Sequence, residues 1–140
     1  MPRAVLDANV FISAALRPEG PPGRLIELFL RTQAFALVLS PAIVDETLRA
    51  LAYPKLKRLL PAGDEPLQWF EDIAVLADLV PGEIEITGVC ADPDDDKYIA
   101  AAIEGRAAFV VTGDRKLLAV ERHEGVLILP PRGFLDLLKA

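Results

Sequence analysis

Cysteine and histidine are almost absent from this chain, which has one of each, Cys90 and His123, among 140 residues. A single cysteine can form neither an intramolecular disulfide nor a thiolate cage for zinc, so the fold must be stabilised by packing. The only histidine stands in a charged Glu-Arg-His-Glu turn, and a nucleophile activated by histidine is therefore not expected. The chemistry of this chain has to rest on other side chains.

Long apolar runs and excess positive charge are also missing. No uninterrupted apolar stretch approaches the roughly 18 to 20 residues of a membrane span, and the amino terminus lacks the pattern of a signal peptide. We therefore expect a cytoplasmic protein with no membrane partner. The net charge of -6 argues against binding nucleic acid through an overall positive field. Local basic groups such as Lys55, Lys57 and Arg58 could still contact phosphates.

Apolar segments of strand and helix type alternate along the sequence. With 52% hydrophobic residues, the chain is long enough for one domain spanning residues 1–140. The alternation predicts an α/β fold with a central parallel sheet of about five strands and helices on both faces. The expected strands are Arg3–Leu6, Phe35–Leu39, Glu83–Thr87, Ala108–Val111 and Val126–Leu129. We expect a plain loop over Arg17–Gly23, because it is rich in proline and glycine.

Four carboxylates follow these predicted strands. Asp7 ends the first strand, Asp114 follows Ala108–Val111, Asp96 opens a helix, and Glu46 lies in the helix after the second strand. The carboxyl ends of parallel strands meet at one edge of the sheet, where open α/β folds place their ligands. Four carboxylates at one place cannot all stay ionised without cations, and oxygen ligands without histidine or cysteine select Mg²⁺ or Mn²⁺. Such ions hydrolyse phosphodiesters by activating water and stabilising the leaving oxygen.

Each acid also has a simpler interpretation. Asp7 could cap the helix that follows it, and Glu46 could be a solvated residue that pairs with Arg49. The acids around Pro93 are typical of turns and caps, which is the role expected for Asp92 and Asp94. Asp95 is intermediate. Asp92, Asp94 and Asp95 all lie close enough in sequence to compete with Asp96 as a ligand, and Asp96 is preferred because it opens the predicted helix and shares a face with Ile99, Ala100 and Ile103.

The order of these segments resembles the PIN domain over nearly the whole chain. The matching stretches are Val-Leu-Asp7-Ala-Asn9-Val, Ser40-Pro41 followed by Glu46, Asp92-Pro93-Asp94-Asp95-Asp96-Lys97 before Ile99-Ala100-Ala101-Ala102, and Val111-Thr112-Gly113-Asp114. The resemblance is closest to stand-alone PIN proteins regarded as toxins of toxin-antitoxin pairs.

The resemblance implies a three-layer α/β/α fold and a Mg²⁺- or Mn²⁺-dependent ribonuclease that cuts single-stranded RNA. It also implies an antitoxin protein and a homodimer as partners. The catalytic and metal-binding acids would be Asp7, Glu46, Asp96 and Asp114. Asn9 and Thr112 match polar positions that orient ligands or water.

Two other functions compete with this interpretation. A PIN-like module that binds RNA or protein without catalysis is disfavoured, because an unused cluster of buried carboxylates destabilises a fold. A Mg²⁺-dependent phosphatase of the haloacid dehalogenase type needs a second aspartate two positions after the first as general acid, and Asn9 stands there instead.

Overall fold

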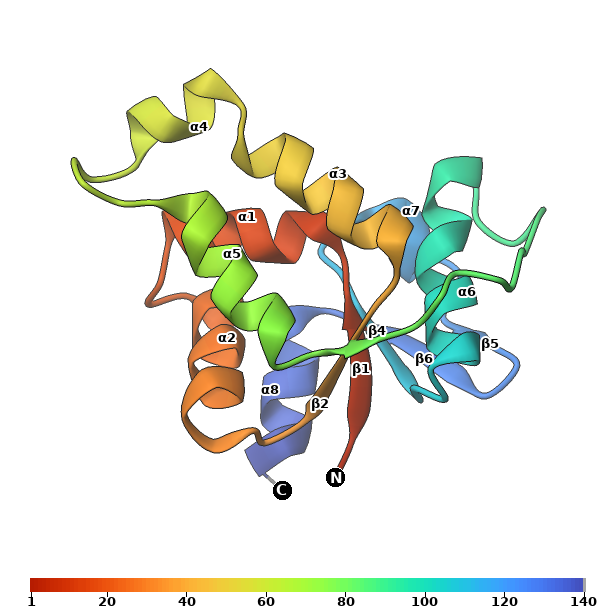
Figure 1. Cartoon of the computed structure of the whole chain (residues 1–140). Helices are drawn as coiled ribbons and strands as arrows, with labels where there is room; N and C mark the ends of the chain where they lie inside the picture. The colour runs from red at the N-terminus through yellow and green to blue at the C-terminus, as the bar shows by residue number, and fades with distance from the viewer. Residues whose placement is uncertain (140) are drawn as a thin grey trace.

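The computed structural model describes residues 1–139, and its centre is a twisted, mostly parallel sheet (Figure 1). Six strands lie in the order β3-β2-β1-β4-β6-β5. All neighbouring pairs are parallel except β5 and β6, which are antiparallel. The strands are β1 (Arg3–Leu6), β2 (Ala36–Leu39), β3 (Asp78–Leu79), β4 (Phe109–Val111), β5 (Arg122–His123) and β6 (Val126–Leu129).

Helices cover both faces of this sheet and give the three-layer α/β/α architecture that the sequence predicts. In Figure 1, α2 and α8 lie on one side of the strands and α6 lies on the other. Contacts of α1 with α2 and α3 complete the first layer, while α6 packs on β1, β2, β4 and β6. The helices are α1 (Ala8–Leu16), α2 (Pro21–Thr32), α3 (Pro41–Leu51), α4 (Pro54–Leu59), α5 (Pro66–Val75), α6 (Asp96–Glu104), α7 (Arg115–Leu118) and α8 (Pro131–Lys139).

The neighbouring strands β1 and β2 are buried on both faces. Val5 and Leu6 of β1, like Val38 and Leu39 of β2, have exposed fractions of 0%. Continuous apolar strands are expected where helices cover both faces of a parallel sheet. The backbone that leaves these strands toward the next helix is therefore held in a close-packed interior.

Helix caps stand directly after three of the strands. Asp7 caps α1 by accepting a hydrogen bond from the backbone N–H of Asn9, and Ser40 caps α3 in the same manner through Ile43. Asp114 caps α7 by accepting from the N–H of Lys116. A short polar side chain at this position satisfies one of the free N–H groups of a first helical turn. Because the strands are parallel, these caps all lie at the carboxyl edge of the sheet.

The expected strand over Glu83–Thr87 is wrong. These residues have no regular structure and none of them is buried. Their segment is attached to α6 instead, because the carboxylate of Glu104 accepts hydrogen bonds from the N–H groups of Gly82 and Glu83, both at 3.0 Å. An alternating pattern cannot distinguish a strand from an extended segment whose N–H groups are bound by a side chain.

Other boundaries also differ from those expected. Pro21–Gly23 begins α2 rather than lying in a loop, because proline at the first helical positions loses no hydrogen bond. The two-residue strands β3 and β5 were too short to give an apolar pattern. Among residues 1–139, no helix combines the length and apolarity needed to cross a membrane.

Glycine at position 23 is required by the contact between α2 and the preceding loop. A Cβ atom there would lie 2.1 Å from the carbonyl oxygen of Pro18. We expect Gly23→Ala to lower the free energy of unfolding by about 1–3 kcal/mol, as measured by urea denaturation, because backbone must move. The matched control is Gly133→Ala in α8, where a Cβ meets nothing closer than 3.5 Å. That substitution should instead stabilise by about 0.5–1 kcal/mol; equal effects of the two would contradict this packing.

Candidate metal centre

Asp7 and Asp114 are linked through the hydroxyl group of Thr112. The ladder between β1 and β4 continues past the strands, since the N–H of Asp7 donates to the carbonyl of Val111 at 3.0 Å. Thr112 donates from Oγ1 to Oδ2 of Asp7 at 2.7 Å and accepts from the N–H of Asp114 at 3.0 Å. Asp7 is 4% exposed and Thr112 is 0% exposed. Both oxygens of Asp7 are thereby oriented, since Oδ1 accepts from the N–H of Asn9.

Asp95 lies beside this pair and carries a buried oxygen without a partner. Its Oδ2 atom is buried and forms no hydrogen bond. Burial, together with the negative charges of Asp92, Asp114 and Asp7, raises the pKa of Asp95 to about 6. Three carboxylates of the candidate site therefore influence one another.

Asp96 is hydrogen-bonded to the backbone of Cys90. Its Oδ1 atom accepts a hydrogen bond of 2.7 Å from the buried backbone N–H of Cys90, and the residue is 4% exposed. This bond fixes the loop that precedes the 3₁₀ turn η1 (Pro93–Asp95) onto the first turn of α6. Burial, followed by the hydrogen bond and charge of Asp96, raises the pKa of the Cys90 thiol to about 12. Cys90 is thus a small buried residue with a neutral thiol.

Asp92 and Asp94 lie at the 3₁₀ turn η1 that precedes α6. Oδ1 of Asp92 accepts from the N–H of Asp94 at 3.0 Å, which confirms the predicted turn and cap role of Asp92. Asp94 pairs with Lys97 at 3.0 Å.

Glu46 is held by two consecutive residues of α6 that the sequence interpretation did not single out. Its Oε1 atom accepts a hydrogen bond from the hydroxyl of Tyr98, and Oε2 accepts one of 2.8 Å from Nζ of Lys97. The alternative pairing of Glu46 with Arg49 is wrong, since Nε of Arg49 donates to the backbone carbonyl of Asp45. No sequence signal marks Lys97 or Tyr98, because the contact joins residues about fifty positions apart.

Burial and charge affect the two partners of Glu46 differently. Burial, the charges of Asp7 and Glu46 and the hydrogen bond to Glu46 raise the pKa of Tyr98 well above its usual range. Burial alone would lower the pKa of Lys97, but the carboxylates of Glu46 and Asp94 outweigh it and the pKa is raised. At neutral pH Tyr98 is therefore a neutral donor and Lys97 a cation.

The acids thus gather at one edge of the sheet in two groups. Asp7, Asp95 and Asp114 form the first, whereas Glu46 is bound to Tyr98 and Lys97. Within residues 1–139, no three acidic, cysteine or histidine side chains are already arranged around a common point suited to a metal ion. The donor set nevertheless fits a hard divalent cation, because it is made of oxygens and includes the unpartnered Oδ2 of Asp95. Such an ion would relieve the repulsion among the acids.

A cleft of about 620 Å³ is lined in part by Asp94, Asp96 and Lys97. Asp7, Glu46, Asp95 and Asp114 are not among its lining residues. Its other walls come from the first turn of α3, from the segment after Pro81 and from α6 as far as Glu104. The volume falls within the range of roughly 300–1,000 Å³ that is usual for ligand sites in proteins.

Comparisons with known proteins agree with this architecture. A sequence model of the PIN domain matches residues 3–116. An uncharacterized protein of Methanocaldococcus jannaschii is 30% identical over 118 residues, which cover 84% of this chain and 74% of that protein. Among solved structures, the crystal structure of VapBC2 from Rickettsia felis bound to a DNA fragment from the promoter has a chain that superposes with a TM-score of 0.58. That match covers 91% of this chain and 98% of the other at 14% identity, so it concerns the fold.

Removing the negative charge of Asp95 should stabilise the folded protein, by an amount that depends on pH. The folded-state pKa of Asp95 lies above its ordinary value of 3.8, so its ionisation reduces stability as the pH rises from about 4 to about 6. In EDTA at pH 7, Asp95→Asn should raise the free energy of unfolding by about 1 kcal/mol, less than the full shift implies because the residue is partly exposed.

Urea denaturation at pH 4 and pH 7 measures this effect. The gain should shrink toward zero at pH 4, where the parent carboxyl is already protonated. Asp136→Asn on the exposed side of α8 is the matched control and should change stability little at either pH. A loss of stability in Asp95→Asn at pH 7, or an equal gain at both pH values, would contradict the repulsion.

Proposed function

The chain belongs to the PIN domain family, and on that basis we propose that it is a Mg²⁺- or Mn²⁺-dependent endoribonuclease that hydrolyses phosphodiester bonds of single-stranded RNA. PIN domains are typically nucleases and generally use divalent metal ions. The observation that carries the proposal for this chain is the unpartnered buried oxygen of Asp95 beside Asp7 and Asp114. The preference for single-stranded RNA rests on the family resemblance.

In this proposal the metal ions are held by Asp7, Glu46, Asp96 and Asp114, and Asp95 contributes its free oxygen. When bound, the ions activate water and stabilise the leaving oxygen of the phosphodiester. The chain itself orients the acids. Thr112 holds Oδ2 of Asp7 toward Asp114. The N–H of Cys90 binds Oδ1 of Asp96, so Oδ2 of Asp96 takes no part in that hydrogen bond.

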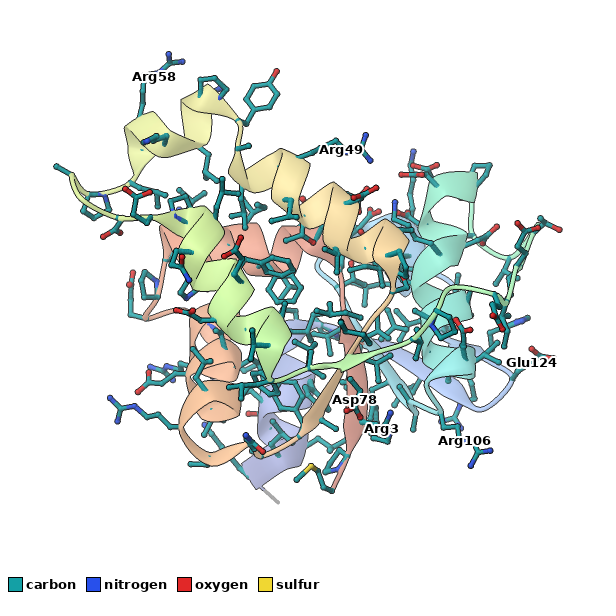
Figure 2. All side chains as sticks on the ribbon, in the orientation of Figure 1. Arg3, Arg49, Arg58, Asp78, Arg106 and Glu124 are labelled. Carbon is teal, nitrogen blue, oxygen red and sulfur yellow. The ribbon has the colours of Figure 1, made fainter. Side chains whose placement is uncertain are left out.

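Binding of an RNA strand to an acidic protein requires local positive charge. Figure 2 shows Arg49 and Arg58 projecting from α3 and α4, at the end of the molecule where β1 leads into α1. Both arginines are exposed, as are Lys55 and Lys57 of α4. Phosphate contacts from this side would position the strand across the acids without reading its sequence.

We further propose that this ribonuclease is the toxin of a toxin-antitoxin pair and that an antitoxin protein covers its site. The support is the shared fold with VapBC2, which was crystallised bound to a DNA fragment from the promoter. The homodimer and the cytoplasmic location stay predictions from the family resemblance and the sequence. The phosphatase alternative remains disfavoured, because Asn9 stands where that chemistry needs an acid.

The first prediction of this proposal concerns metal-dependent cleavage. The purified chain should cut a mixed-sequence single-stranded RNA in Mn²⁺ or Mg²⁺ but not in EDTA, as followed on a denaturing gel. Asp7→Asn should reduce the rate by at least about 100-fold, because it removes a ligand charge at the centre of the acids. The fold should persist in this variant, since one repulsive charge is gone.

The control for that experiment is Asp136→Asn, which changes an exposed acid on α8. Equal cutting by the Asp7→Asn variant and the parent would show that the site is assigned wrongly. If the parent neither cuts RNA nor binds an ion in calorimetry, the chain is instead a PIN-like binding module without catalysis.

Removing the positive charges of Arg49 and Arg58 should weaken the binding of RNA. The double variant Arg49→Gln and Arg58→Gln should raise KM for RNA several-fold and reduce the salt dependence of KM, with little change in kcat, because each removed phosphate contact lowers the salt slope by roughly one. Arg106→Gln removes an exposed arginine at the opposite end of the molecule and is the matched control (Figure 2). An equal rise in KM for Arg106→Gln would refute a specific role of this surface.

A further inference from the structure

Lys97 and Tyr98 together occupy both oxygens of one candidate metal ligand. Tyr98 donates to Oε1 of Glu46, and Lys97 donates to Oε2 at 2.8 Å. The two residues are consecutive in the first turn of α6, whereas Glu46 lies in α3. Glu46 is therefore not a free surface acid but a side chain whose orientation is fixed from the neighbouring helix.

Tyr98 connects Glu46 to the start of α1. Its hydroxyl oxygen accepts a hydrogen bond of 3.3 Å from the N–H of Ala8, the residue after Asp7. With that N–H as donor, the single proton of the hydroxyl is directed to Glu46. Tyr98 is 2% exposed, so its ring cannot move without disturbing the core. The position of Glu46 is in this way set relative to the backbone that carries Asp7.

Lys97 supplies positive charge to the same carboxylate. Its ammonium group lies between Glu46 and Asp94, at 2.8 and 3.0 Å, and its side chain is only 17% exposed. The same nitrogen lies 5.3 Å from the centre of the Tyr98 ring. A cation at this place compensates Glu46, and it repels any divalent ion that approaches the same oxygen.

We propose that Tyr98 is a positioning residue that holds Glu46 for metal binding, and that Lys97 is the counterion of Glu46 which a divalent ion must displace. This inference rests on the proposed function, because it takes Glu46 as a metal ligand. Hydrogen-bond donors behind a metal ligand commonly change metal affinity about 10- to 100-fold when they are removed. The two residues should therefore have opposite effects on metal binding.

The experiment measures the dissociation constant of Mn²⁺ by calorimetry, and by the loss of the electron paramagnetic resonance signal of free Mn²⁺. Tyr98→Phe should weaken binding about 10- to 100-fold, since Glu46 loses its fixed orientation. Lys97→Met should strengthen binding several-fold, because a competing positive charge is gone. Tyr53→Phe is the matched control. Tyr53 precedes α4 and is 65% exposed, and its substitution should leave the dissociation constant of Mn²⁺ unchanged.

A double-mutant cycle separates positioning from general damage to the fold. In the Glu46→Gln background, Tyr98→Phe should cause little additional loss of Mn²⁺ affinity, because the ligand that it positions is no longer a carboxylate. Circular dichroism of each variant checks the fold. If Tyr98→Phe does not fold, the cycle of Lys97→Met with Glu46→Gln is measured instead, and the gain from Lys97→Met should disappear in the double variant.

Several results would overturn the inference, and they can be told apart. Tyr98→Phe with parental affinity, or with the same loss in the Glu46→Gln background, would refute positioning while leaving the nuclease proposal intact. Weaker Mn²⁺ binding by Lys97→Met would refute the counterion role. A parent protein that binds no Mn²⁺, or that binds it equally well after Glu46→Gln, would overturn both this inference and the assignment of Glu46.

Discussion

Repulsion among carboxylates at the carboxyl edge of the sheet is the interaction that defines the candidate site of this protein. Parallel strands deliver Asp7 and Asp114 to one edge, and η1 places Asp95 beside them with a buried oxygen that nothing binds. A fold would not retain such an arrangement for stability, because buried charges without partners cost free energy. The arrangement fits the divalent-cation site proposed here, because a bound cation would offset this cost.

Asp7, Asp96 and Glu46 are each held by a neighbour that also has a structural role. Thr112 joins β4 to Asp7, the N–H of Cys90 secures Asp96, and Tyr98 connects α6 to both α1 and Glu46. These bonds orient carboxylates that would otherwise move apart. The local geometry of the site is therefore maintained by the same contacts that join the layers of the fold, and metal binding and stability should respond together to substitutions there.

Much of the fold could be predicted from the sequence, since the apolar strands and the caps at Asp7, Ser40 and Asp114 are local signals. The segment Glu83–Thr87 could not, because its alternation resembles a strand while its N-terminal end is bound by Glu104. The order of the acids along the chain indicated one edge of the sheet. Which acid faces the others was beyond the sequence: Asp95 and Asp96 are neighbours with the same chemistry, and only the turn at η1 directs one toward Asp7 and the other toward Cys90.

The most direct test of the central claim is the anomalous scattering of Mn²⁺ in crystals of this protein. We expect a peak within coordination distance of Asp7 and Asp114, with Asp95 or Asp96 completing the oxygen ligands and Glu46 bound to the ion instead of to Lys97, while Tyr98 still donates to Glu46. Crystals soaked in saturating Mn²⁺ that show no ion among these acids, with Glu46 still paired with Lys97, would contradict this expectation.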